Sequence, residues 1–215
     1  MKRLLLCSTF LLLGACTAPA PPAAAPAEAP TAAAPAPVEV PSIATTTPAL
    51  APPSFDCAKA SSDAEKLVCG DAELAALDRQ LAQRYAQAEK KDPAVERGWA
   101  KGRDDCWKEE DPRLCVFDAY RTRLVELAIQ APGATAPKAV EYRCSDNATP
   151  FTMTYYNDID PQAAVMAWGN DQAIVFPQPA ASGAKYGRSG VEYWEHQGEA
   201  SVDVFGNKLS CRPLS

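Results

Sequence analysis

The sequence predicts a multidomain protein: a small all-α, disulfide-stapled helical domain followed by a small all-β antiparallel barrel. Three observations predict this fold class. Apolar residues recur at helical spacing between residues 55 and 131, and they alternate with polar residues between residues 138 and 215. Six cysteines are divided between these two segments. Helical spacing is typical of helices with one buried face, whereas alternation is typical of half-buried strands.

The first 15 residues have the pattern of an export signal. Lys2 and Arg3 precede an apolar run that ends near Leu13, and this run is only about half as long as a membrane-spanning helix. The following Gly14-Ala15-Cys16 resembles the lipobox of bacterial lipoproteins, which implies that residues 1–15 are removed and that Cys16 carries a lipid. The alternative is an ordinary secretory signal. Thr17, where an aspartate would favour the inner membrane, favours the outer membrane facing the periplasm.

Residues 16–54 are expected to form a lipid-anchored linker rich in Pro and Ala. This segment contains no aromatic residue, and its only charged residues are Glu28 and Glu39. It offers little apolar surface for a packed core, so we expect it to be disordered or to adopt polyproline II. The linker would let the folded part stand away from the membrane.

The charge balance of the chain is acidic, with a formal net charge of −6. Residues 54–131 carry 13 basic and 16 acidic side chains, and residues 138–215 carry 6 and 9. The absence of a basic patch argues against nucleic acid as a partner, whereas an acidic surface attracts a basic protein. With one histidine and no glycine-rich phosphate loop, the sequence predicts no enzyme, cofactor, metal ion or small-molecule substrate.

The cysteines predict three disulfides. Cys7 leaves with the signal and Cys16 takes the lipid. The six that remain are Cys57, Cys69, Cys106, Cys115, Cys144 and Cys211. An even number in an exported protein indicates disulfide bonds. If the two halves are separate domains, Cys144 pairs with Cys211; among the other four we expect the close pairs, Cys57–Cys69 and Cys106–Cys115, but the sequence leaves their pairing open.

Four helices are expected between residues 55 and 131. Ser62-Asp63-Ala64-Glu65 has the form of a capping box, and Asp71 can cap the next helix. Asp92-Pro93 and Asp111-Pro112 each combine a capping residue with proline at the first helical position. The helix after Asp71 has an apolar stripe of Leu74, Leu77, Leu81 and Tyr85. The last helix is expected to bury Leu114, Phe117 and Leu124.

The motifs of this half resemble the LprI-like domain of bacterial envelope proteins. The resemblance is carried by Phe55 to Ala60, Ala64 to Cys69, Glu73 to Asp78, Trp99, Arg103 to Cys106, and Cys115 to Leu124. It covers nearly the whole segment. Some members of that family are associated with lysozyme inhibition, and many have no assigned activity. Core packing also accounts for Trp99 and for the apolar stripe.

Seven or eight short strands are expected between residues 138 and 215. Candidate strands are residues 140–144, 151–156, 163–168, 172–176, 191–196, 201–205 and 208–211. Gly169-Asn170-Asp171 and Gly206-Asn207 are turn signals. Many short strands within 80 residues predict a small barrel or sandwich, whose first and last strands a Cys144–Cys211 bond would join.

This half resembles the membrane-bound inhibitor of c-type lysozyme, the MliC family. The resembling residues are Tyr142 to Cys144, Phe151 to Tyr156, Ala181 to Tyr186, Tyr193-Trp194, Gly198 to Ala200, and Cys211. The resemblance implies an antiparallel β-barrel that blocks the active-site cleft of c-type lysozyme, which is thus the expected protein partner. The main function expected is protection of peptidoglycan; the alternative is an envelope adaptor that binds another envelope component without inhibiting lysozyme.

The resemblance also implies which residues contact lysozyme. Ser182 matches the serine that the family inserts into the cleft, Gly183 permits a tight turn and close approach, and Tyr186 is a support or a contact. The family usually has a Trp-x-Lys-Gly stretch. Here the equivalent position is His196 or Gln197, depending on whether it is counted from Trp194 or from Gly198. Lys185 is the remaining candidate for the cation.

Overall fold

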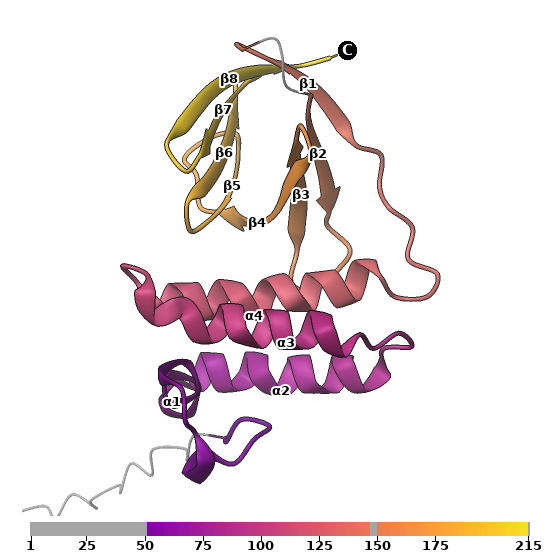
Figure 1. Ribbon diagram of the computed structural model, residues 1–215. Coiled ribbons are helices and arrows are strands. Elements are labelled where there is room, and N and C mark those ends of the chain that lie inside the picture. The colour runs from indigo at the N-terminus through magenta and orange to yellow at the C-terminus, as the bar shows by residue number, and fades with distance from the viewer. Residues whose placement is uncertain (1–50, 147–149, 215) are drawn as a thin grey trace, which may run out of the picture. The chain divides into compact units, whose positions relative to one another are not determined.

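The computed structural model describes residues 51–146 and 150–214 (Figure 1). The expected signal peptide, the lipid site at Cys16 and the linker as far as residue 50 lie outside the described residues. The helical half contains α1 (Asp63–Gly70), α2 (Ala72–Gln87), α3 (Pro93–Asp104) and α4 (Pro112–Ile129), with short 3-10 helices at Cys57–Lys59 and Asp105–Lys108. No helix within the described ranges is both long enough and apolar enough to cross a bilayer.

The ends of the helices are fixed by the residues that the sequence predicts. The Ser62 hydroxyl accepts the N–H of Glu65, and the Glu65 carboxylate accepts the N–H of Ser62, which completes the capping box at the start of α1. Asp71 caps α2 by accepting N–H groups of its first turn. Pro93 and Pro112 each occupy the first turn of their helix. All four expected helices are therefore confirmed.

Asp71 also links two helices by charge. Its second carboxylate oxygen lies 2.7 Å from Nε of Arg113 at the start of α4. The hydrogen bond from Arg113, followed by backbone N–H groups at the start of α2, lowers the pKa of Asp71 from its usual value. Because the charged form is the one held in the fold, this carboxylate stabilises the helical half only while it is ionised.

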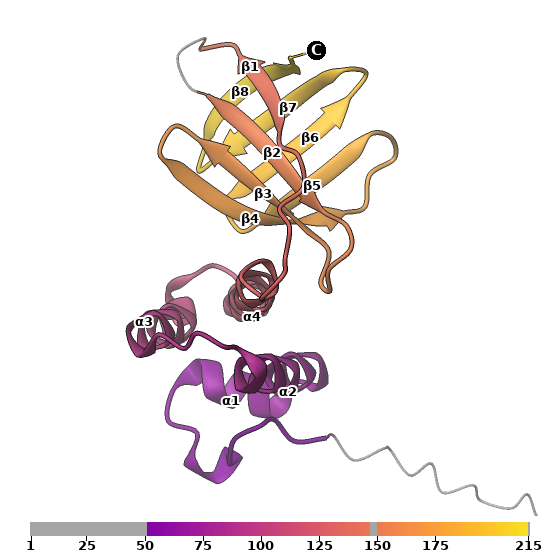
Figure 2. The same cartoon turned by 90° about the vertical axis from the view of Figure 1, so that its right-hand side faces the viewer.

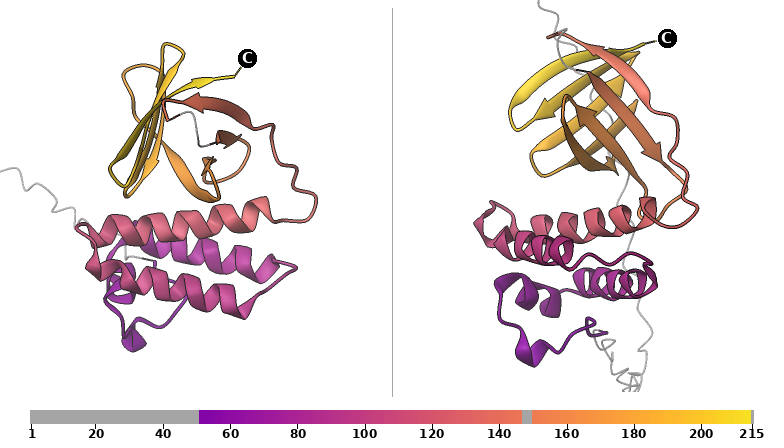
Figure 3. Two further views of the ribbon diagram at one scale, coloured as in Figure 1. Left: turned by 45° about the horizontal axis from the view of Figure 1, so that its top comes forward. Right: turned by 45° about the vertical axis from the view of Figure 1, so that its right-hand side comes forward.

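The apolar core of the helical half lies where α4 packs against α2 and α3 (Figure 3). Leu74, Leu81 and Leu124 are buried there, as their spacing predicts. The expectation for Leu114 was wrong, because its side chain is 43% exposed. Leu114 lies in the first turn of α4, where the helix has only just begun and its side chain does not reach the core.

A buried polar chain runs through this core. The hydroxyl of Tyr120 donates to Asp78 at 3.0 Å and accepts from Arg103 at 3.1 Å. Arg103 also bonds Asp104, and Trp99 packs edge-on against the Tyr120 ring. These are motif residues of the LprI-like resemblance. Their common role is structural, because they satisfy one another inside the fold.

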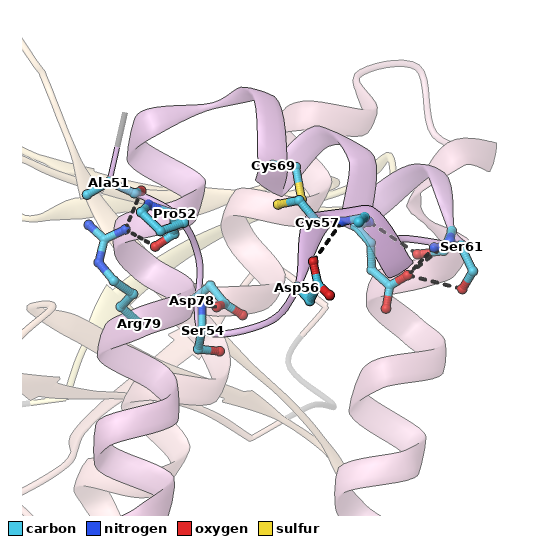
Figure 4. Close-up of a disulfide and its surroundings, with 12 residues drawn as sticks. Ala51, Pro52, Ser54, Asp56, Cys57, Ser61, Cys69, Asp78 and Arg79 are labelled. Carbon is cyan, nitrogen blue, oxygen red and sulfur yellow. Dashed lines mark hydrogen bonds between the residues drawn. A yellow bond between two sulfur atoms is a disulfide. The ribbon is translucent and has the colours of Figure 1, made fainter. Parts of the chain in front are cut away.

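The chain is fastened to α2 before the first helix begins. The N–H of Ser54 donates to Asp78 at 2.6 Å, and Arg79 donates to the carbonyl oxygens of Ala51 and Pro52 at 2.8 Å each (Figure 4). Residues 51–54, which the sequence assigns to the end of the linker, are thus part of the folded structure.

Three disulfides close the fold, and they are the expected pairs. Cys57–Cys69 ties the first 3-10 helix to α1, and Cys106–Cys115 ties the second 3-10 helix to α4. Cys144–Cys211 joins residues that face each other on β1 and β8. The longest of the three loops, between Cys144 and Cys211, removes the most entropy from the unfolded chain.

Residues 140–213 form a closed antiparallel barrel of eight strands, in which each strand pairs with the next and β8 pairs with β1 (Figure 2). The strands are β1 (Val140–Cys144), β2 (Phe151–Tyr156), β3 (Ala163–Trp168), β4 (Asp171–Gln178), β5 (Ala184–Arg188), β6 (Val191–His196), β7 (Glu199–Val204) and β8 (Asn207–Pro213). The expected all-β barrel is confirmed. Closure leaves no free edge among these strands.

The barrel interior is filled by aromatic and aliphatic side chains, with a hydroxyl cluster at its centre. Tyr142 and Tyr193 share a hydrogen bond of 2.7 Å between their hydroxyls, and Tyr155 donates to Tyr193 at 3.0 Å. Phe151 stacks on the ring of Tyr193. Burial raises the pKa of Tyr193 and of Tyr155 well above the usual value, so both hydroxyls stay neutral.

One strand lies outside the candidate strands of the sequence. No strand was assigned between residues 176 and 191, but β5 begins at Ala184 and pairs along its length with β6. The strand is short and contains Gly187, so it shows little of the alternation that marks the others. The loop between β4 and β5 therefore spans only residues 179–183, and it is called the serine loop below.

Candidate functional site

The serine loop meets the end of β6. Ala184 faces Glu195 across the two strands, so the residues just before Ala184 lie beside His196 and the turn that follows it. All five residues of the serine loop are exposed. The loop and the β6–β7 turn thus share one end of the barrel, which is called the loop end below.

Ser182 is held in place by two side chains of β6. Its hydroxyl lies 3.0 Å from Nδ1 of His196, and its carbonyl oxygen accepts a hydrogen bond of 3.1 Å from Nε1 of Trp194. The indole and imidazole rings are stacked, with centroids 5.7 Å apart. Strand alternation explains the pair, because residues two apart on β6 point to the same face. Ser182 is therefore exposed but oriented.

Gly183 is required by the backbone that it touches. Its φ is +75°, a conformation that favours glycine. A Cβ at this position would lie 1.9 Å from the carbonyl oxygen of Glu195, which is main-chain and cannot rotate away. The sequence predicts a close backbone approach at Gly183, and in the structure the main chain of Gly183 approaches the main chain of β6. This close approach brings Ser182 next to His196.

Lys185 and Tyr186 point in opposite directions from β5. Nζ of Lys185 forms an ion pair of 2.8 Å with Glu192 on the outer face of the barrel. The ring of Tyr186 packs among Tyr155 and Tyr193 in the interior, and burial raises the pKa of its hydroxyl. The half-buried ring of Tyr186 thus packs in the barrel interior, and the ammonium group of Lys185 is paired with a carboxylate.

Gln197 occupies the tip of the β6–β7 turn. It has a φ of +53° and is followed by Gly198 at +79°, between the paired residues His196 and Glu199. Two successive residues with positive φ in a two-residue hairpin are typical of a type I′ turn. The exposed amide of Gln197 extends the loop end beyond His196.

Of the six predicted contacts, the structure brings Ser182, Gly183 and His196 together, with Gln197 next to them. Trp194 is the residue that the sequence analysis missed as part of the site. It is 39% exposed, and it holds both the serine loop and the imidazole. The alternation of β6 could have revealed it, because His196 and Trp194 share a face. Within the described ranges, no group of three or more His, Cys, Asp or Glu side chains is placed to hold a metal ion.

Known proteins match the barrel and most of the chain. The model of the family described as membrane-bound lysozyme-inhibitor of c-type lysozyme matches residues 142–210. Lipoprotein LprI of Mycobacterium bovis and its counterpart in Mycobacterium tuberculosis are each 44% identical over 174 residues, covering 79% of this chain and 88% of the relative. The chain belongs to the LprI lipoprotein family. The family match thus spans the helical half as well as the barrel, and both resemblances drawn from the sequence are confirmed.

One solved structure also matches part of the chain. It is that of Pseudomonas aeruginosa MliC in complex with hen egg white lysozyme, with 27% sequence identity and a TM-score of 0.31. The match covers 39% of this chain and 91% of that one.

Proposed function

We propose that this chain is a proteinaceous inhibitor of c-type lysozyme that places its serine loop in the active-site cleft of the enzyme. The observation that carries the proposal is the Ser182–His196 pair, exposed at the loop end and fixed by Gly183 and Trp194. The match of residues 142–210 to the family of inhibitors of c-type lysozyme supports the choice of partner.

The chemistry of the pair suits a cleft lined by acids. Lysozyme cleaves glycosidic bonds with two carboxyl groups that flank the scissile bond. When His196 is protonated, both ring nitrogens donate hydrogen bonds. Nδ1 then donates to the Ser182 oxygen 3.0 Å away, which leaves the serine hydrogen free for one carboxylate. The second ring nitrogen, or the amide of Gln197, is available for the other.

Pre-organisation favours this arrangement over a mobile loop. Ser182 is bonded through both its carbonyl and its hydroxyl, so little conformational freedom remains to be lost on binding. The acidic balance of the barrel half, with 6 basic and 9 acidic side chains over residues 138–215, favours encounter with a basic enzyme.

The location of the chain follows from the lipid anchor expected at Cys16. We place the protein in the cell envelope, held by lipid at the outer membrane and facing the periplasm, where the inhibitor would shield peptidoglycan. Two or more acyl chains give stable anchoring without a membrane-spanning helix. We propose no enzymatic role.

An envelope adaptor that does not inhibit lysozyme is the second candidate. It is favoured by one observation: the two permanent cations next to the loop end, Lys185 and Arg212, are each paired with a carboxylate of the barrel, Glu192 and Glu199. In that case the full chain would not slow cell-wall lysis, and it would bind an envelope component instead.

The test uses two serine–glycine sequences that lie at opposite ends of the barrel. Ser182→Ala should weaken inhibition of hen egg white lysozyme by about 1–3 kcal/mol, roughly 5- to 160-fold, because a buried carboxylate loses its donor. The matched control is Ser189→Ala, since Ser189 also precedes a glycine of positive φ but lies in the β5–β6 turn. Equal inhibition by both variants would reject the serine-loop mechanism.

His196 is tested by two substitutions. His196→Lys places a permanent cation beside Ser182 and should inhibit at least as well as the unsubstituted protein, whereas His196→Gln offers only a neutral donor and should inhibit less. Equal inhibition by the two variants would exclude a role for positive charge at position 196.

A further inference from the structure

Among the fully described connections, three two-residue hairpin turns lie at the end of the barrel opposite the serine loop. Residues 169–170 join β3 to β4, residues 189–190 join β5 to β6, and residues 205–206 join β7 to β8. A cavity of about 380 Å³ opens at this end, which is called the hairpin end below. Its walls include Trp168, Asp171, Gln172, Arg188, Phe205 and Asn207.

Phe205 is an unexpected residue for the place it holds. Its φ is +49° and it is followed by Gly206 at +88°, as in a type I′ turn. Such turns favour Asn, Asp or Gly at the first position, and a bulky side chain is a clear outlier there. The ring is also 73% exposed to solvent. The backbone conformation therefore costs stability while the exposed ring contributes little by burial, and backbone outliers of this kind cluster at functional sites.

The main chain of Phe205 is bonded to the neighbouring turn, and its ring lies on that turn. Its N–H donates to the carbonyl oxygen of Gly190 at 2.7 Å. A Cβ on Gly190 would lie 2.3 Å from the ring, so glycine there lets the ring lie against the β5–β6 turn. The two turns thus place an exposed aromatic ring beside the second aromatic wall, Trp168.

The polar side chains of the cavity are available for a ligand. In the part of the chain that the structure describes, the side chains of Asp171, Gln172 and Asn207 have neither a hydrogen bond nor an ion pair with the rest of the protein. Asp171 and Arg188 contribute one negative and one positive charge. The cavity walls therefore carry no net charge, which favours a neutral ligand over a polyanion.

We infer that the hairpin end binds a short neutral saccharide of one or two sugar rings. The C–H face of a sugar packs on aromatic rings, which Trp168 and Phe205 supply, while its hydroxyls need carboxylate and amide partners. Asp171 and Asn207 supply these. The volume lies near the lower end of the range for small-ligand sites, about 300–1,000 Å³. This site is separate from the proposed lysozyme contact and does not depend on it.

Calorimetric titration of the full chain in detergent tests the inference. The probes are diacetylchitobiose, which offers two N-acetylated amino sugars, and maltose, which offers two plain glucose rings. Binding of either in the millimolar range is expected, and the difference between them identifies the class of sugar. No heat of binding with either probe would overturn the inference.

Phe205→Asn is the decisive variant, because asparagine suits the turn that phenylalanine strains. It should raise or preserve the melting temperature and weaken saccharide binding at least tenfold. Gln197→Asn makes the same Asn-Gly turn at the loop end and should leave saccharide binding unchanged. Asp171→Ala, on an exposed residue, should also weaken binding.

Three results would contradict the inference. Unchanged saccharide affinity in Phe205→Asn would show that the ring is not part of a site. A clear loss of stability in this variant would assign Phe205 a structural role. If Phe205→Asn lost lysozyme binding and kept its affinity for saccharides, the hairpin end would be a contact surface for a protein instead.

Discussion

Replacing Gly183 with alanine should disable the loop end while leaving the barrel folded. An L-residue in this left-handed conformation costs about 1–2 kcal/mol. The added Cβ would stand 1.9 Å from the carbonyl oxygen of Glu195, whereas real Cβ contacts are not shorter than 3.0 Å. A gap of about 1 Å must therefore open between the serine loop and β6, since both contacting groups are fixed to the main chain.

A displacement of that size breaks the two hydrogen bonds that orient Ser182, at 3.0 and 3.1 Å. The loss of aligned bonds to a partner carboxylate is worth about 1–3 kcal/mol. We therefore expect Gly183→Ala to weaken lysozyme inhibition at least tenfold, equal to about 1.4 kcal/mol. The assay is a titration of lysozyme-driven lysis of a cell-wall suspension, with thermal unfolding as the measure of folding.

Gly206→Ala is the matched control. Gly206 also has a positive φ, +88°, but a Cβ there meets nothing within 4 Å, and it lies at the hairpin end. It should cost stability without weakening inhibition. If Gly183→Ala inhibits as well as the unsubstituted protein, or if Gly206→Ala loses as much inhibition, a serine loop seated on β6 is refuted as the inhibitory element.

Three further predictions concern the fold. Tyr120→Phe should destabilise the helical half by about 1–3 kcal/mol in chemical denaturation, because Asp78 and Arg103 each lose a buried hydrogen-bond partner. The control, Tyr85→Phe, should change the free energy of unfolding by less than about 0.5 kcal/mol. Equal losses in the two variants would contradict a stabilising role for the buried polar chain. The Cys144–Cys211 bond joins residues that are 67 positions apart in the sequence. Removing it should lower the stability of the barrel by roughly 4 kcal/mol in the chain-entropy model, and an unchanged melting temperature would contradict this prediction. The pKa of Asp71 is lowered in the fold. Its contribution to stability is therefore fully present above the unfolded pKa of about 3.9 and is lost as the pH falls further. In an acid titration followed by circular dichroism, Asp71→Asn should reduce the pH dependence of helix loss, and a titration curve identical to that of the unsubstituted protein would reject this role.

The helices could be predicted because their signals are local. A capping box or an Asp-Pro pair involves residues only a few positions apart, and the same residues form the caps in the structure. The spacing could not show how the motif residues are used. Asp78, Arg103 and Tyr120 are separated by many positions, and only the packing of three helices brings them into one buried polar chain.

The candidate site was predicted in part, because the resemblance specifies residues but not their directions. It indicated Ser182 and Gly183, and the sequence left open whether His196, Gln197 or Lys185 takes the place of the family's lysine. The directions of Lys185 and Tyr186 could not be predicted, because they follow from pairing across β5 and β6, which turns Lys185 outward to Glu192 and Tyr186 inward. The strain at Phe205 had no signal in the sequence, because Phe-Gly is not a recognised turn pair and its positive φ depends on both neighbouring strands.

The loop end is the surface that we expect to meet lysozyme. Amide hydrogen exchange of the full chain, with and without hen egg white lysozyme, tests this claim most directly. We expect slower exchange at residues 179–183 and 196–198 on addition of the enzyme, with no change in the turns at 169–170, 189–190 and 205–206. Exchange that is unchanged at the serine loop, or slowed only at the hairpin end, would contradict the claim.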